Sequence, residues 1–324
     1  MTSATTDRTT DPGTDPAAGP GAPAAPRPGT AGATVLAYAG RQVRALHRLE
    51  PEVRRDAPDS VHRMRVACRR LRSCFRSYRR VLDRTVTAAL EGELIWLAGE
   101  LSGDRDREVL AERFRERLAE LPPALIRGPA RDRLRGYGSP RGGQPATRTR
   151  VLAALDSDRF RELLAGLDAL LTAPPLLPAA DRPDGKVCAK VLRTDARRFA
   201  GRMETARAAP PGPLRDHALH AARKAAKRAR YSAEAARPAL GKAAARAEIT
   251  RWTALQDLLG EHQDSTVARE ALVELAGRAE AAGEPSFTYG LLHGRETALA
   301  DEYERRLAAL YPGHGPRDGT PGAG

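Results

Sequence analysis

The sequence predicts an all-α protein. Ala, Leu, Arg and Glu recur at helical spacing through most of the 324 residues, aromatic residues make up 4%, and no alternating run of Val, Ile and Thr indicates a strand. The expected helices cover approximately residues 34–49, 60–82, 86–101, 105–120, 150–171, 186–207, 214–236, 241–259, 262–281 and 286–309.

Segments rich in Pro, Gly and Ala interrupt this helical pattern. Residues 1–32 and 311–324 carry too few large apolar side chains to offset the entropy of ordering them, so both are predicted to be disordered. Two interior breaks, 122–144 and 173–185, are predicted to be loops. We therefore expect a folded region over 33–310, with a first half at about 33–171 and a second half at about 186–310.

The composition restricts the class of partner and the compartment. Lys plus Arg (54) exceed Asp plus Glu (41), which gives a net charge of +13 and favours a polyanion such as nucleic acid, an anionic membrane or polyphosphate. The three cysteines form no CxxC pair and are expected to be buried thiols in a reducing cytosol. No apolar run approaches the ~20 residues that span a bilayer, and no secretory signal is recognisable, so the prediction is a cytoplasmic protein without a membrane partner.

An internal repeat dominates the sequence. Residues 60–83, SVHRMRVACRRLRSCFRSYRRVLD, match residues 219–233, LHAARKAAKRARYSA, at an offset of 158 that continues without a gap for about 50 residues. This offset indicates two related helical halves, and such halves commonly pack about a pseudo-two-fold axis. The basic pairs that it aligns are His62 with His220, Arg65 with Arg223, Arg69 with Lys227, Arg70 with Arg228, and Arg72 with Arg230.

Both repeats concentrate positive charge on one helix face. At 100° per residue, His62, Arg65, Arg69, Arg72 and Arg76 form a ridge beside an apolar stripe. The second copy repeats the ridge with His220, Arg223, Lys227 and Arg230, and Glu234 takes the place of Arg76. Three residues of the helix that precedes the second copy could widen its ridge: Lys190, Arg193 and Arg197. Arg70 and Arg228, which the repeat also aligns, project from the other side of their helices.

The absence of counter-charge distinguishes these ridges from a solvated helix face. Neither 60–82 nor 217–233 contains Asp or Glu, although opposite charges at i,i+4 would stabilise each helix by ~0.2–0.5 kcal/mol. Guanidinium groups bind phosphate oxygens in a bidentate manner. The ridges therefore indicate an anion-binding surface. His62 and His220 could be phosphate donors or structural histidines, and Asp106 and Asp264 are expected to be helix caps rather than partners of those histidines.

The repeated motifs closely resemble the signature of CHAD domains, the conserved histidine α-helical domains. The segments that carry the resemblance are VHRMRVACRRLR and LHAARKAAKRARY, followed by LSGDRDREVL and LQDLLGEHQDSTV, which look like the family's Leu-Gly-x-x-x-Asp turn between helices. The resemblance covers about 33–309. It implies two similar four-helix bundles around a basic central channel, and binding of inorganic polyphosphate with localisation at polyphosphate granules. The matching positions are His62, Arg65, Arg69, Arg70, Arg72, His220, Arg223, Lys227, Arg228 and Arg230.

Two other functions were weighed against polyphosphate binding. The chain lacks HExxH and a Walker A motif, its histidines are not at ligand spacing, and the ridges exclude carboxylates. A metal-dependent phosphohydrolase is therefore not expected, and we predict no catalytic residue, no metal site and no cofactor. Nucleic acid would respond to the same charge, but the chain contains no Asn and only Tyr231 lies near a ridge, so at most non-specific binding is expected.

Overall fold

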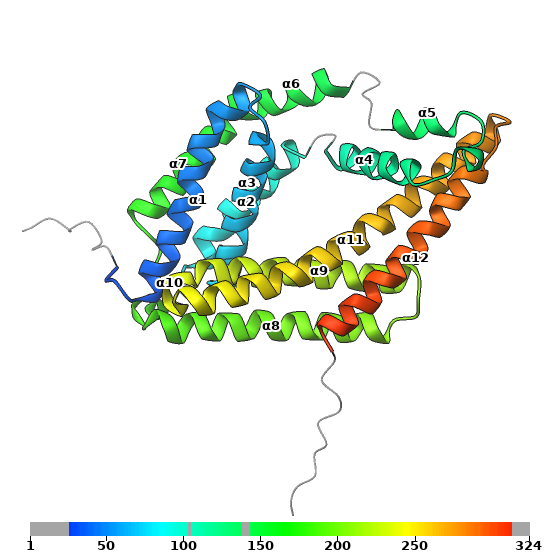
Figure 1. Cartoon of the computed structure of the whole chain (residues 1–324). Coiled ribbons are helices and arrows are strands. Elements are labelled where there is room, and N and C mark those ends of the chain that lie inside the picture. Colours follow the sequence, from blue (N-terminus) through cyan, green and yellow to red (C-terminus); the bar gives the residue numbers. More distant parts are fainter. Residues whose placement is uncertain (1–25, 103–104, 138–142, 313–324) are drawn as a thin grey trace, which may run out of the picture.

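The computed structural model describes residues 26–102, 105–137 and 143–312, and the prediction of an all-α protein is confirmed over these ranges (Figure 1). No strand forms in the described ranges; two isolated bridges join Thr30 to Pro183 and Leu82 to Leu176. The α-helices are α1 (Ala31–Arg54), α2 (Ser60–Ser77), α3 (Arg84–Glu100), α4 (Arg105–Ala119), α5 (Ala130–Arg135), α6 (Gly143–Asp156), α7 (Asp158–Thr172), α8 (Asp184–Ala208), α9 (Pro213–Ala235), α10 (Arg237–Leu240), α11 (Lys242–Ala281) and α12 (Phe287–Leu310), with short 3-10 turns at Pro123–Leu125 and Pro178–Asp181.

Helices α1, α2, α3 and α7 pack around the first core, to which α6 adds Val151 and Leu155. Short polar side chains cap α1, α3 and α7, because their oxygens accept from backbone N–H groups that lack a partner in the first turn. Asp83 accepts from Thr85 N at 2.8 Å at the start of α3, and Ser157 accepts from Phe160 N at 3.2 Å at the start of α7. The Ser157 cap divides the helix predicted at 150–171 into α6 and α7.

Helices α8, α9, α11 and α12 share a second core. The apolar face of α9 is built from fully buried alanines, including Ala222 and Ala226, which let neighbouring helices approach closely. Phe199 of α8 meets Trp252 of α11 edge to face, with ring centroids 5.2 Å apart. These contacts place α9 at the centre of the second half, with its basic side chains directed away from the alanines.

A third core joins the two halves of the sequence. Helices α4 and α5, which come from the first half of the sequence, pack against α11 and α12, with Phe114 and Leu272 each about 1% exposed. Arg113 of α4 donates to Glu296 of α12 at 2.8 Å, and Glu296 is completely buried. Figure 1 shows the resulting frame, in which α1–α3 and α7 form one side, α8, α9 and α11 the base, and α12 the other side.

The predicted turn in LQDLLGEHQDSTV is wrong, because α11 runs without interruption through it. Leu255 and Leu259 are buried in the second core while Ala268 and Leu272 are buried in the third, so one continuous helix contributes to both cores. Packing on both sides outweighs the ~1 kcal/mol cost of Gly260 within a helix. In the first copy α3 ends at Glu100 and α4 begins at Arg105, so a break does occur there.

Other predicted boundaries also shift. Helix α2 ends at Ser77 rather than residue 82, and Tyr78 follows as its buried C-cap. Helix α1 begins at Ala31, inside the tail predicted over 1–32, because Thr30 caps it; residues 1–25 and 313–324 of the predicted tails lie outside the described residues. Helix α5 forms within the break predicted at 122–144. Cys68, Cys74 and Cys188 are free and buried, as expected. Across the described ranges, no helix combines the length and apolarity that crossing a membrane requires.

Candidate anion-binding site

The two repeated basic helices meet near their C-terminal ends. Tyr78, just after α2, donates through its hydroxyl to the Ser232 carbonyl oxygen of α9 at 3.2 Å, and Ser232 Oγ donates to Ser77 Oγ at 2.9 Å. From this junction α2 and α9 diverge toward their N-termini as two sides of the frame (Figure 1). Their basic ridges therefore approach each other close to the junction and separate beyond it.

Five basic side chains of α2 and α9 are electrostatic neighbours in succession, from Arg72 through Arg69, Lys227 and Arg223 to His220. We call them the basic cluster: Arg69 and Arg72 of α2, and His220, Arg223 and Lys227 of α9. Each is half-buried. Lys227 lies in the electrostatic field of Arg69 as well as of Arg223, so both repeats contribute to one cluster.

Burial, followed by repulsion from Arg223 and Arg69, lowers the pKa of Lys227 to about 8. A buried ammonium group surrounded by guanidinium groups is costly, since each charge loses water and gains a repulsive neighbour. Burial also lowers the pKa of Arg72, and repulsion from Arg76 acts in the same direction. The free protein therefore holds positive charges that an anion would stabilise.

Three hydrogen-bond donors of the cluster have no acceptor. The Nε atoms of Arg69, Arg72 and Arg223 are buried and make no hydrogen bond within the described part of the chain. A buried donor without an acceptor costs ~1–3 kcal/mol, and such groups are rare in folded proteins. The planar guanidinium group offers its donors together to a phosphate or carboxylate. The cluster thus has the geometry of a site for an oxyanion.

One carboxylate borders the cluster, and the histidine of the cluster has a lowered pKa. Asp264 lies near Arg223 and Lys227, and burial raises its pKa even though Arg223 opposes the shift. The prediction that Asp264 caps a helix is wrong, because it lies in the middle of α11; the Asp106 side chain is outside the described residues. Burial, with repulsion from Lys224, lowers the pKa of His220, and Gln263 opposes the shift. The shift favours the neutral form of His220 in the free protein.

Other ridge residues have partners on neighbouring helices. Arg70 pairs with Glu234 at 2.9 Å, and Arg230 donates to Gln256 at 2.9 Å and pairs with Glu234 at 3.1 Å. Arg76 pairs with Glu91 of α3. His62 and Arg65 lie half-buried on α2, toward its N-terminus. Sequence reasoning placed these residues on the correct faces but did not reveal the carboxylates that other helices bring to them.

A second basic site lies beyond the junction. This outer basic pocket is a cavity of about 550 Å³ between the end of α2 and the start of α8. Arg228 enters it from α9 and pairs with the buried Asp195 at 3.1 Å. The other cationic residues that line it are Arg76, Arg79, Arg80, Arg182, Lys186, Lys190 and Arg198.

Only some of the predicted binding residues outside the basic cluster line the outer basic pocket. Lys190 and Arg228 belong to this pocket rather than to the basic cluster, and Arg193 and Arg197 are exposed on α8 and do not line it. The sequence prediction missed Arg79 and Arg80, although both stand in the first basic repeat, because α2 was expected to continue to residue 82.

The cluster and the pocket form one continuous path of positive charge. Arg76 lines the outer pocket and also repels Arg72, which in turn interacts with Arg69. Lys227 continues the path to α9, where it interacts with Arg223 and His220. Arg69 and Arg76 are seven residues apart, or ~10 Å along a helix. The path is therefore long enough for several charges of a linear anion.

The CHAD domain family model matches residues 37–273, which is well over half of the chain. The chain belongs to the CHAD domain family. Two Mycobacterium tuberculosis proteins, MT2285 of strain CDC 1551 / Oshkosh and Rv2226 of strain H37Rv, are each 39% identical over 272 residues, which are 83% of this chain and 50% of theirs. The CHAD chain thus spans about half the length of these curated relatives.

Two solved structures share the CHAD fold. The CHAD domain from the plant Ricinus communis is 25% identical, with a TM-score of 0.63 over 90% of this chain and 94% of the plant chain. PptA from Streptomyces chartreusis is 19% identical, with a TM-score of 0.65 over 87% of this chain and 99% of PptA. The second likeness shows the fold alone.

Proposed function

We propose that this CHAD domain binds inorganic polyphosphate along the basic cluster. The observation that carries the proposal is the set of buried guanidinium donors without acceptors, at Arg69, Arg72 and Arg223, around a Lys227 whose pKa is about 8. Phosphate oxygens supply both the missing acceptors and the missing negative charge. The family resemblance supports the same ligand.

Polyphosphate suits the site better than nucleic acid. Binding of single strands uses exposed aromatic rings on which bases stack. Tyr231, the aromatic residue near the ridge, is 5% exposed, and its ring carries Arg230 at 4.7 Å and Arg70 at 5.9 Å. Its face is therefore occupied by cations of the same chain. Polyphosphate needs no stacking surface, only closely spaced cations.

The proposal is tested by calorimetric titration at ~0.15 M salt with long-chain polyphosphate, duplex DNA and single-stranded DNA. The Arg69→Ala/Arg223→Ala/Lys227→Ala variant removes three charges of the basic cluster. A matched control, Arg202→Ala/Lys242→Ala/Arg246→Ala, removes three charges from exposed positions. We expect tight polyphosphate binding in wild type and control and its loss in the cluster variant. Equal binding by both variants, or tighter binding of DNA, would overturn the proposal.

We further propose that the domain binds polyphosphate without hydrolysing it and associates with polyphosphate granules. Residues 60–77 of α2 and 217–233 of α9 contain no carboxylate that could hold a catalytic metal beside the basic cluster. Release of orthophosphate from polyphosphate is the assay for hydrolysis. A fluorescent fusion that stays diffuse in granule-containing cells would contradict the granule association.

A further inference from the structure

Outside the basic cluster, three metal-binding side chains converge from three helices. Asp216 of α9, His262 of α11 and Glu304 of α12 each direct one ligand atom to a common point, and these atoms all lie within 4.8 Å of one another. The three residues are far apart in the sequence, which is why the spacing of histidines along the chain gave no sign of a metal site. We propose that this trio binds a divalent transition-metal ion, with Zn²⁺ the best-matched candidate.

The position of His262 Nε2 favours an ion over a hydrogen bond. This nitrogen lies 3.3 Å from Glu304 Oε1 and 3.5 Å from Asp216 Oδ1. Both distances exceed the ~2.7–3.2 Å of a good N–H···O hydrogen bond. They match the ~3.3–3.4 Å between neighbouring ligand atoms of a tetrahedral zinc ion with bonds of ~2.0–2.1 Å. The two distances from His262 Nε2 are thus compatible with ligand atoms that share one ion, and all three ligand atoms lie within 4.8 Å of one another.

Burial adds an independent observation. The His262 side chain is 4% exposed, and its Nε2 atom is buried without a hydrogen-bond partner among the described residues. A buried imidazole nitrogen that faces two carboxylate oxygens requires either a proton or a cation between them. An ion bound to all three atoms would satisfy every group at once.

The outer oxygens of both carboxylates are already held. Arg269 Nη2 lies 2.9 Å from Asp216 Oδ2, and Arg215 Nη1 lies 3.3 Å from Glu304 Oε2. Each carboxylate therefore turns its other oxygen toward His262. Partners of this kind orient metal ligands and are part of most metal sites.

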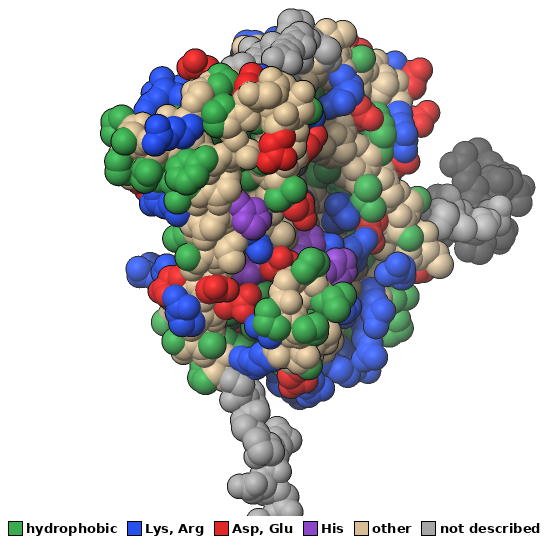
Figure 2. Space-filling model, turned by 90° about the vertical axis from the view of Figure 1, so that its right-hand side faces the viewer, with side chains coloured by type: hydrophobic (Ala, Val, Ile, Leu, Met, Phe, Trp, Pro, Cys, Tyr) green, Lys and Arg blue, Asp and Glu red, His purple; other side chains and the backbone are tan. Residues whose placement is uncertain are grey.

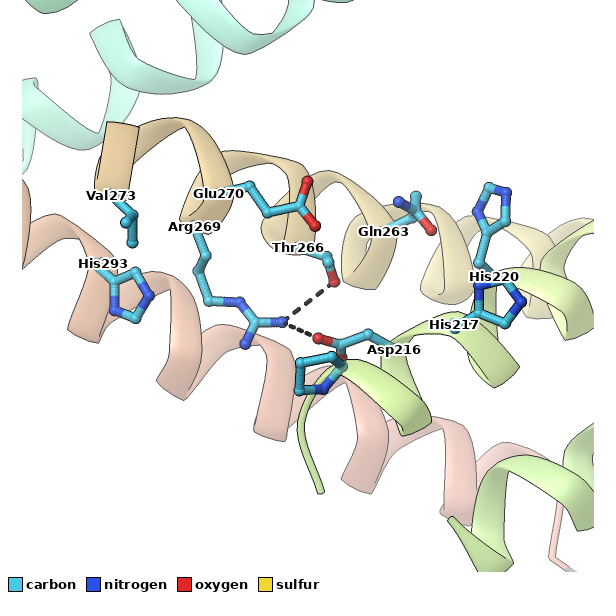
Figure 3. A pocket seen from close by; sticks show the side chains of 10 residues that line it. Asp216, His217, His220, Gln263, Thr266, Arg269, Glu270, Val273 and His293 are labelled. Carbon is cyan, nitrogen blue, oxygen red and sulfur yellow. Dashed lines mark hydrogen bonds and ion pairs between the residues drawn. The ribbon is translucent and has the colours of Figure 1, made fainter. Parts of the chain in front are cut away.

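The donor set selects the kind of ion. One imidazole nitrogen with two carboxylate oxygens suits Zn²⁺ and its neighbours in the transition series, whereas Mg²⁺ and Ca²⁺ prefer oxygen ligands alone. Three protein ligands leave a fourth position for water. Of the three residues, Asp216 lines a cavity of about 420 Å³ together with His217, His220 and Gln263 (Figure 3). Figure 2 shows histidine side chains gathered in a hollow of this face.

The test uses the full chain, with any affinity tag removed, stripped of metal and free of polyphosphate. Titration with ZnCl₂ should show one strong site per chain and a higher melting temperature, and MgCl₂ should produce neither effect. CoCl₂ should give the intense visible absorption of a four-coordinate ion. Because polyphosphate is absent, failure of this experiment does not bear on polyphosphate binding, and the reverse also holds.

Three variants decide the assignment. His262→Gln and Glu304→Gln should each weaken Zn²⁺ binding by ~100-fold or more, since each removes one of three ligands. His217→Gln, an exposed histidine of the same cavity, should leave it unchanged. Metal-free melting curves of Glu304→Gln show whether the variant folds. The proposal is overturned if Zn²⁺ fails to bind at 0.1 mM (a concentration ~100-fold above a micromolar Kd), or if Glu304→Gln binds as well as wild type.

Discussion

Arg70 Nε lies 2.9 Å from Glu234 Oε2, and this ion pair joins α2 of the first repeat to α9 of the second. The offset of 158 aligns Glu234 with Arg76 and Arg228 with Arg70, and Arg228 donates to the carbonyl oxygen of Arg76 at 2.7 Å. The position of Arg70 in one repeat therefore contacts the position of Arg76 in the other repeat in both directions. Arg70 pairs with the Glu234 carboxylate, and Arg228 donates to the Arg76 carbonyl oxygen. The predicted pseudo-two-fold axis requires reciprocal contacts of this kind between α2 and α9.

Glu234→Gln should destabilise the fold by about 2 kcal/mol, because it leaves two half-buried guanidinium groups, Arg70 and Arg230, without their carboxylate. The measurement is the free energy of unfolding in urea at pH 7. Glu302→Gln is the control, since Glu302 forms an exposed pair with Arg305 that contributes at most ~0.5 kcal/mol. If both variants lose the same free energy of unfolding, the Arg70–Glu234 pair between α2 and α9 stabilises the fold no more than an exposed ion pair does.

Lys227 should make polyphosphate binding depend on pH. Its pKa of about 8 in the free protein lies below the ~10.4 of an unperturbed lysine, and bound phosphate raises it again. Affinity should therefore fall as the pH rises from 7 to 9, and binding at pH 8 should take up protons. Calorimetry in buffers of different ionisation enthalpy measures this uptake. Lys227→Arg should abolish it and the exposed Lys242→Arg should not; uptake that persists in Lys227→Arg would assign it to another group.

The lowered pKa of Lys227 should also make the stability of the free protein depend on pH. Because the pKa of Lys227 is lower in the folded than in the unfolded state, the unfolded chain binds the extra proton between about pH 8 and ~10.4. The contribution of Lys227 to stability therefore rises with pH over this window. Lys227→Met should be more stable than wild type at pH 7, where the buried charge is present. A less stable Lys227→Met variant would show that the ammonium group has a stabilising partner.

The buried pair of Arg113 and Glu296 should control stability in acid. Burial alone would raise the pKa of Glu296, but the hydrogen bonds and charge of Arg113 outweigh it and lower the pKa. The folded pKa is thus below the unfolded one, so the stabilisation is complete above ~4.3 and is lost as the pH falls through the folded value. Arg113→Met should cost about 3 kcal/mol at pH 7 and remove much of this acid dependence, as measured by urea unfolding at pH 7 and pH 4. An unchanged acid dependence would assign it to other carboxylates.

Local periodicity was sufficient to predict the helix faces. The 100° spacing placed Arg69, Arg72, Arg223 and Lys227 on one ridge per repeat and directed Arg70 and Arg228 elsewhere, and the structure agrees. The repeat added what periodicity lacks, a long-range relation, because equivalent faces of duplicated helices tend to meet. Arg69 and Lys227, aligned by the offset of 158, are electrostatic neighbours.

Contacts with helices that the repeat does not align could not be predicted in this way. The continuity of α11 depends on the core residues that α4 and α5 pack against it. Because α11 is continuous, Asp264 lies within the helix at the border of the basic cluster rather than at a predicted helix cap. The partners of Arg76 and Arg230, Glu91 and Gln256, come from other helices, and their identity follows from packing alone. The trio of Asp216, His262 and Glu304 has the same origin.

The salt dependence of polyphosphate binding should separate the basic cluster from the exposed face of α8. Each cation that neutralises a ligand phosphate releases counterions, which steepens the fall of log K with log salt by ~0.7–0.9 per contact for nucleic acids. Arg69→Gln and Arg223→Gln should each reduce this slope by a similar amount, because their buried Nε atoms lack acceptors. Arg197→Gln removes the same charge from an exposed position on α8 and should leave the slope unchanged. An equal change in all three variants would mean that polyphosphate binds through the net charge of the surface, and the basic cluster would then have no specific role.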